Sequence, residues 1–130
     1  MRITWLIGLA GLSLSTSVNA EWFKIAETQQ GSVWYIDPSH VKLVGTKMQA
    51  WIRSDGRGDR TVKWAEMKEL LSFDCSADTV KTLSVVEYDS YGKIIASQSV
   101  TDYGYGYDPV VPDTMAEAAE KVACSAATAN

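Results

Sequence analysis

The two cysteines of this 130-residue chain, Cys75 and Cys124, lie in two different settings. Cys75 ends a stretch from Leu70 that is typical of a strand, whereas Cys124 lies near the end of an alanine-rich segment that opens at Pro112. Behind an N-terminal export signal, the simplest interpretation is one disulfide that pins a C-terminal helix onto a sheet. Such a bridge closes a loop of about 50 residues and stabilises the fold by roughly 4 kcal/mol.

The first 20 residues have the pattern of a secretory signal peptide. Arg2 supplies the positive end, an apolar run extends from residue 3 to residue 14, and Val18 and Ala20 are the small residues before a cut. The apolar run is short for a bilayer, so we expect a cleaved leader rather than a retained membrane helix. The mature chain is then exported, and it is periplasmic, secreted or held at the cell surface.

About 110 residues follow the predicted cut, which suits one domain at 21–127 with a short tail at 128–130. The sequence pI of about 4.9 argues against nucleic acid as a partner. Acidic side chains concentrate in the second half. Residues 21–70 hold eight basic and seven acidic groups, whereas residues 71–130 hold three basic and nine acidic groups. Solubility explains this imbalance, and a face that attracts a basic partner is the alternative.

Short segments of alternating or β-branched residues predict a mainly antiparallel sheet of about six strands with one C-terminal helix. The expected strands are 22–26, 33–36, 41–44, 47–53, 64–75, 79–88 and 93–100, and a loop is expected at 54–60. The stretch 64–75 also has strong helix propensity. We predict a strand there because Met67, Leu71 and Phe73 fall on one side and the neighbouring strands need pairing partners.

The helix is expected to begin after Pro112, where Thr114 and Glu117 have the spacing of a capping box. The apolar face of the segment consists of Met115, Ala119, Val122 and Ala126, widened by Ala116 and Ala123. Cys124 falls at the edge of that face. The periodicity therefore allows the bridge to Cys75 but does not by itself establish it.

Three segments together resemble one protein family. They are Trp34-Tyr35-Ile36-Asp37-Pro38-Ser39, Phe73-Asp74-Cys75, and Pro112-Asp113-Thr114 ten residues before Cys124. In this order, and with this cysteine spacing, the pattern is similar to the bacterial surface-adhesin protein E-like domains. The resemblance covers residues 22–124. It implies an antiparallel sheet with a C-terminal helix tethered to one face by a Cys75–Cys124 disulfide, and adhesion to host extracellular proteins.

The residues provide no catalytic, cofactor or metal signature. Two distant cysteines and one histidine do not supply four zinc ligands at the usual spacing. Asp37 and His40 could suggest a catalytic dyad, but the segment that joins them is better interpreted as a turn. We therefore expect a protein that is not an enzyme. A small hydrolase using two carboxylates is the weaker alternative, and it requires a cleft with two acids, one of them with a raised pKa.

Two loops are candidate ligand-binding segments. Arg57 and Asp59 flank Gly58 in the tripeptide that integrins recognise, although glycine and aspartate are also ordinary turn residues. Tyr103, Tyr105 and Tyr107 alternate with glycine and offer flat amphipathic rings of the kind that binding loops use. The alternative for these tyrosines is that their rings fold back and cover a sheet edge.

The function favoured by the sequence is an exported, non-catalytic binding module that engages another protein through its sheet face or its loops. The partner is an unidentified host or envelope protein, and the chain indicates neither the identity of this partner nor the oligomeric state. The main alternative is a periplasmic or envelope accessory protein without an adhesive role.

Overall fold

The computed structural model describes Gly11, residues 21–99 and residues 106–126. The predicted signal peptide apart from Gly11, the last predicted strand residue Val100 and the predicted tail 128–130 lie outside the described residues.

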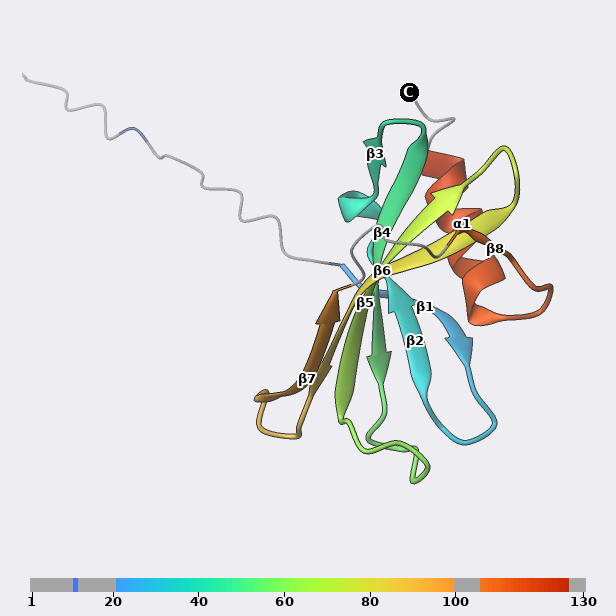
Figure 1. Ribbon diagram of the computed structural model, residues 1–130. Coiled ribbons are helices and arrows are strands. Elements are labelled where there is room, and N and C mark those ends of the chain that lie inside the picture. Colours follow the sequence, from blue (N-terminus) through green and yellow to red (C-terminus); the bar gives the residue numbers. More distant parts are fainter. Residues whose placement is uncertain (1–10, 12–20, 100–105, 127–130) are drawn as a thin grey trace, which may run out of the picture.

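One antiparallel sheet forms most of the described structure, as predicted (Figure 1). Its strands are β1 (Phe23–Glu27), β2 (Val33–Ile36), β3 (Lys42–Val44), β4 (Lys47–Asp55), β5 (Glu66–Asp74), β6 (Thr79–Tyr88), β7 (Ile94–Ser99) and β8 (Asp108–Pro109). Six strands run in the order β1-β2-β4-β5-β6-β7, while β3 pairs with β4 and β8 pairs with β6. A short 3₁₀ helix, η1 (Pro38–His40), follows β2, and the helix α1 (Met115–Ala126) comes last.

The ambiguous stretch at 64–75 is a strand, because β5 lies between two long partners. It pairs with β4 from Met48↔Phe73 to Asp55↔Glu66 and with β6 along its whole length. These two ladders satisfy the backbone groups of β5 on both edges, and tertiary pairing thereby overrides the local helix propensity.

The loop predicted at 54–60 begins two residues later than expected. Ser54 and Asp55 extend β4, because Ser54 pairs with Trp34 and Met67 and Asp55 continues the same two ladders. The side chain of Ser54 is fully buried. Its polarity favoured a loop in the sequence, but its backbone is held by strands on both sides.

The core lies between one face of the sheet and α1. Alternate residues of β4 point to this face, together with residues of β2 and β5, and the small side chains of α1 let the helix approach closely. The buried cluster consists of Ile36, Met48, Ala50, Ile52, Leu71, Phe73, Ala119 and Ala123. Figure 1 shows α1 on one side of the sheet, near the end that holds β3 and β8.

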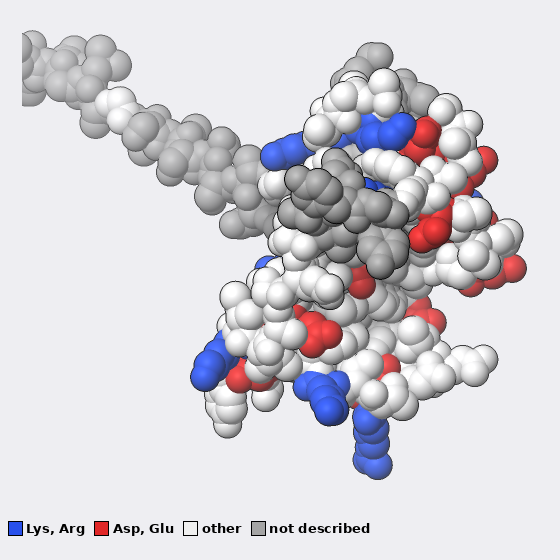
Figure 2. All heavy atoms as spheres, in the orientation of Figure 1, with Lys and Arg blue, Asp and Glu red and all other residues white. Residues whose placement is uncertain are grey.

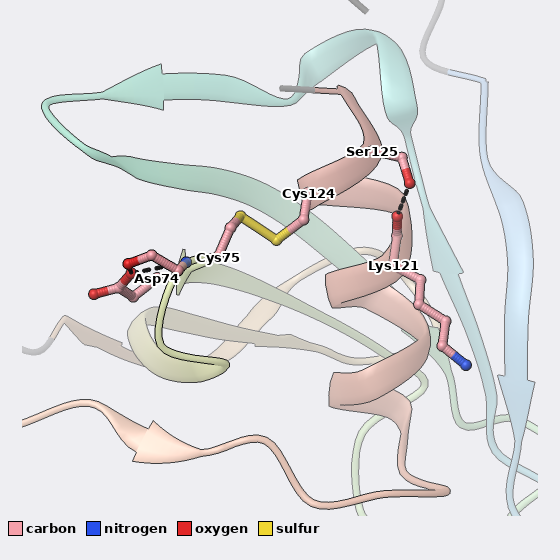
Figure 3. The surroundings of a disulfide bond; sticks show 6 residues. Asp74, Cys75, Lys121, Cys124 and Ser125 are labelled. Carbon is pink, nitrogen blue, oxygen red and sulfur yellow. Dashed lines mark hydrogen bonds between the residues drawn. A yellow bond between two sulfur atoms is a disulfide. The ribbon is translucent and has the colours of Figure 1, made fainter. Parts of the chain in front are cut away.

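A disulfide joins Cys75, directly after β5, to Cys124 in the last turns of α1, with Cα atoms 5.7 Å apart (Figure 3). The predicted covalent link between helix and sheet is therefore confirmed. At the start of α1, the backbone N–H of Glu117 donates to the hydroxyl of Thr114 at 3.4 Å. The Glu117 carboxylate accepts from the backbone N–H of Asp113 rather than of Thr114, so the capping box is formed with a shift of one residue.

Replacing Gly31 with alanine is expected to destabilise the protein by clearly more than the same change at Gly92. Both glycines have positive φ, which costs about 1–2 kcal/mol for other residues. A Cβ at Gly31 would also lie 2.5 Å from the carbonyl oxygen of Gly58, whereas a Cβ at Gly92 meets nothing within 4 Å. Urea unfolding of the two variants measures the difference, and equal losses would contradict the close approach of the two loops.

Candidate functional site

We call the sheet face opposite α1 the outer face. Because side chains alternate along a strand, residues between the core positions of β2, β4 and β5 point to this face. One row across it runs from Tyr35 through Arg53 and Lys68 to Val86, each pair directly opposite in neighbouring strands. The helix α1 packs on the other face, where its buried alanines belong to the core cluster.

A groove of about 350 Å³ opens on the outer face. Its lining residues are Trp22, Asp37, His40, Trp51, Lys68, Val86 and Tyr88. A second hollow of about 250 Å³ adjoins it, lined by His40, Lys42, Gln49, Trp51 and Leu70. Trp51 and His40 belong to both, so Trp51 forms a common floor between them. We call the two hollows together the Trp51 groove.

The histidine of the groove is fixed by a buried carboxylate. Nδ1 of His40 lies 2.6 Å from Oδ2 of Asp37, whose side chain is 1% exposed. Burial raises the pKa of Asp37, but hydrogen bonds from Ser39 and His40 outweigh this and leave it below its ordinary value. Asp37 is therefore an anion that accepts from Nδ1–H. Among the described residues nothing bonds to Nε2 of His40, and the side chain is 44% exposed.

The same residues also build the turn that the sequence predicted. Oδ1 of Asp37 accepts the backbone N–H of Ser39 at 2.9 Å and caps η1, while the Ser39 hydroxyl donates to the same oxygen at 2.6 Å. The Ser39 hydroxyl approaches His40 only at Nδ1, the nitrogen that already faces Asp37. A serine nucleophile activated by Nε2 is thus not formed here.

Two cations and two tyrosines frame one side of the outer face. The guanidinium of Arg53 lies 5.2 Å from the ring centre of Tyr35, and Nζ of Lys68 lies 5.5 Å from that of Tyr88. Glu66 lies between the cations, 3.5 Å from Arg53 and 3.6 Å from Lys68. Because one carboxylate serves two cations, the cluster keeps a net positive charge on an otherwise acidic protein.

The loop containing Arg57 and Asp59 is held closed by internal hydrogen bonds. Asp59 is only 6% exposed, and its carboxylate accepts from the hydroxyls of Ser32 and Thr61 and from the backbone N–H of Thr61. These bonds lower the pKa of Asp59. The Arg57 side chain is 55% exposed and lies 3.5 Å from Asp55. The two side chains are therefore not presented together to solvent.

Tyr107 lies against the sheet. Its hydroxyl is 2.8 Å from the hydroxyl of Ser72, and Nζ of Lys47 lies 5.3 Å from its ring centre. Ser72 belongs to β5, which is paired on both sides, so this contact lies on the sheet face and not at a sheet edge. Tyr103 and Tyr105 lie outside the described residues.

Two carboxyl groups have raised pKa values. Burial raises the pKa of Glu69. The pKa of Glu120 is raised by burial and then by the charges of Asp78 and Glu117. Asp78 and Glu120 line a pocket beside the disulfide together with Lys121 and Ser125. The Trp51 groove has Asp37 as its single acid, and that carboxylate is engaged by Ser39 and His40.

Acidic side chains are unevenly distributed over the surface, as the sequence indicated. In the view of Figure 2 several of them lie along the right-hand border, where α1 and the segment before it lie in Figure 1, and others lie in the lower half. Basic side chains lie mainly at the upper and lower ends of this view.

Acid is expected to weaken the fold through Asp74. Hydrogen bonds from Lys47 and Ser76 lower its pKa from 3.8 to about 2. The ionised carboxylate therefore stabilises the folded state above the unfolded pKa, and this stability is lost as pH falls from about 4 to about 2. In urea unfolding across this pH range, the free energy of unfolding should fall less steeply with acid for Asp74→Asn than for the wild type. Asp108→Asn, an exposed control in β8, should follow the wild type, and parallel curves for all three would contradict the prediction.

Within the described part of the chain, no group of three or more histidine, cysteine, aspartate or glutamate side chains is arranged to hold a metal ion. In the same part of the chain, no helix has the length and apolar character needed to cross a membrane.

Sequence reasoning missed the Trp51 groove, although its signals were present. In β4 the buried residues Met48, Ala50 and Ile52 alternate with Gln49, Trp51 and Arg53, so the sequence pattern places the latter three on the face opposite the core. Tryptophan and arginine on the face away from the core are typical of binding surfaces. The spacing of Asp37 and His40 was noticed, but the turn was treated as excluding a side-chain pair, and the structure contains both.

One comparison identifies relatives of the chain. The family model described as Surface-adhesin protein E matches residues 22–125, which include every described strand and nearly all of α1. No curated protein and no solved structure matches the chain.

Proposed function

Because the chain belongs to the surface-adhesin protein E family, we propose that it is an exported, non-catalytic binding module that engages another protein through the outer face of its sheet. Family membership supports a binding role at the cell exterior. The composition of the outer face supports the choice of surface. The loops at Arg57–Asp59 and Tyr103–Tyr107 are the alternative contact segments.

The observation that carries this proposal is the Trp51 groove with its flanking Tyr35, Arg53 and Tyr88. Tryptophan, tyrosine and arginine are the residues that most often dominate protein–protein binding energy. Here they are half-buried, so their conformations are restricted before a partner arrives, which lowers the entropy cost of association. The face also carries cations, which suits an acidic partner surface.

The proposed cellular location follows from the predicted leader. We propose that residues 1–20 are removed and that the domain acts outside the cytoplasm, where the disulfide persists. Intact mass of the exported chain should correspond to a start at Glu21. Protease-accessible material on intact cells supports an adhesive role, whereas release by osmotic shock supports the envelope accessory role.

Two arginine variants distinguish the face from the loop. The exported wild-type chain is measured by biosensor against a panel of host extracellular-matrix proteins and envelope proteins. For each protein that binds, Arg53→Ala should weaken the affinity, and Arg57→Ala should leave it unchanged. If Arg57→Ala weakens the affinity and Arg53→Ala does not, the binding surface is the loop and not the outer face. If the wild type binds no protein of the panel, the proposed function is contradicted.

A further inference from the structure

We propose that the Trp51 groove is a binding site for an acidic saccharide, in which pyranose rings stack on Trp51 and their carboxylates meet Lys42 and Lys68. The proposal deepens the proposed function and rests on it in one respect, because a glycosylated partner would present such a chain to the outer face.

The position of the groove within the sheet favours a ring-shaped ligand over an extended peptide. The groove lies over β4, β5 and β6, whose backbone groups are already paired in continuous ladders. An extended peptide therefore finds no free backbone N–H or C=O there with which to add a strand. Recognition has to come from side chains, and the indole of Trp51 is the aromatic surface that both hollows share.

The lining combines apolar surface with a few directed polar groups, as ligand sites do. Trp22, Trp51, Val86 and Tyr88 provide faces against which the C–H side of a sugar ring packs. His40 lines this space, and with Nδ1–H donating to Asp37, its Nε2 is the ring nitrogen left to accept from a ligand hydroxyl. In the adjoining hollow, the amide of Gln49 offers both a donor and an acceptor.

The charges of the groove select an anionic ligand. Lys42 lines one hollow and Lys68 lines the other, so a cation lies at each side of Trp51. Lys42 is exposed and forms no ion pair within the described residues. Lys68 shares Glu66 with Arg53, which leaves its charge partly available. The only acid of the groove, Asp37, is buried and committed to Ser39 and His40.

The size of the two hollows suits two sugar units rather than one. The hollows have volumes of about 350 Å³ and about 250 Å³, and they share the side chains of Trp51 and His40. A disaccharide unit with a carboxylate on one ring brings one carboxylate to the groove, so a second repeat is needed to supply the other lysine. The ligand class is therefore a uronate-containing oligosaccharide.

The test uses the exported chain and a tetrasaccharide of alternating glucuronic acid and N-acetylglucosamine as the probe, followed by isothermal titration and saturation-transfer NMR. The neutral tetrasaccharide of N-acetylglucosamine is the matched ligand control. We expect the acidic probe to bind, with transfer to its ring protons. Trp51→Ala should weaken its affinity about tenfold or more, the effect expected for the loss of one aromatic stacking contact.

The lysine variants separate charge recognition from stacking. Lys42→Gln combined with Lys68→Gln should remove the preference for the acidic over the neutral probe, while Lys93→Gln in the distant hairpin should leave it unchanged. Wild-type chain that binds neither tetrasaccharide, or binds both equally, overturns the saccharide proposal. If the saccharide proposal fails in this way but a protein of the panel binds the wild type and binds Arg53→Ala more weakly, the proposed function is retained. If the acidic probe binds but no panel protein does, the saccharide site stands and the protein-binding function fails.

Discussion

Removing the disulfide with Cys75→Ala and Cys124→Ala together is expected to lower the free energy of unfolding by about 4 kcal/mol. The bridge spans 49 residues, and the chain-entropy account assigns about this value to a loop of that length. Domains of this size are stable by about 5–15 kcal/mol, so the loss is a large fraction of the total. Urea unfolding with a two-state fit measures it.

The loss should be concentrated at the helix. Ala119 and Ala123 are fully buried, but α1 presents mainly small side chains to the sheet, so packing alone holds it weakly. Hydrogen exchange in α1 should accelerate more than exchange in β4 and β5. A reductant should destabilise the wild type to the same extent and leave the double variant unchanged. A loss below about 1 kcal/mol would contradict the role assigned to the bridge.

Trp51→Ala is expected to weaken binding of the protein partner at least about 30-fold, which corresponds to about 2 kcal/mol. Trp51 lies at the centre of the outer-face groove and lines both of its hollows. Removing the indole deletes the apolar surface that the two hollows share. The affinity is measured by biosensor with the protein that the wild type captures.

Tyr91→Ala is the matched control for this change. Tyr91 is 94% exposed at the tip of the hairpin between β6 and β7, so the substitution removes an aromatic ring that lies outside the groove. The affinity of this variant for the partner should equal that of the wild type. Thermal unfolding of both variants shows whether the fold is retained. An unchanged affinity of folded Trp51→Ala would exclude the groove from the interface.

The sequence predicted the architecture because its signals are local or covalent. Strand alternation placed Met67, Leu71 and Phe73 on one side of a strand, and two cysteines in unlike segments indicated the helix-to-sheet link. The strand at 64–75 was harder, since helix propensity and strand alternation both fit it. The choice was correct because neighbouring strands needed a partner, which is a tertiary argument rather than a local one.

The candidate site was less predictable because it is assembled from residues far apart in the chain. Trp22, Trp51 and Tyr88 meet only once the strands take their order in the sheet. The burial of Asp59 was equally hidden, since its partner Ser32 lies 27 residues earlier. A short motif in a loop indicated exposure, whereas the packing of Gly31 against Gly58 turns the aspartate inward.

Hydroxyl-radical footprinting of the wild-type chain, with and without its protein partner, shows whether the outer face is the binding surface. We expect oxidation of Trp51 and Tyr88 to slow in the complex, while oxidation of the exposed Tyr91 continues at its free rate. Unchanged oxidation of Trp51 and Tyr88, with protection appearing at Tyr91 instead, would contradict the assignment of the outer face as the binding surface.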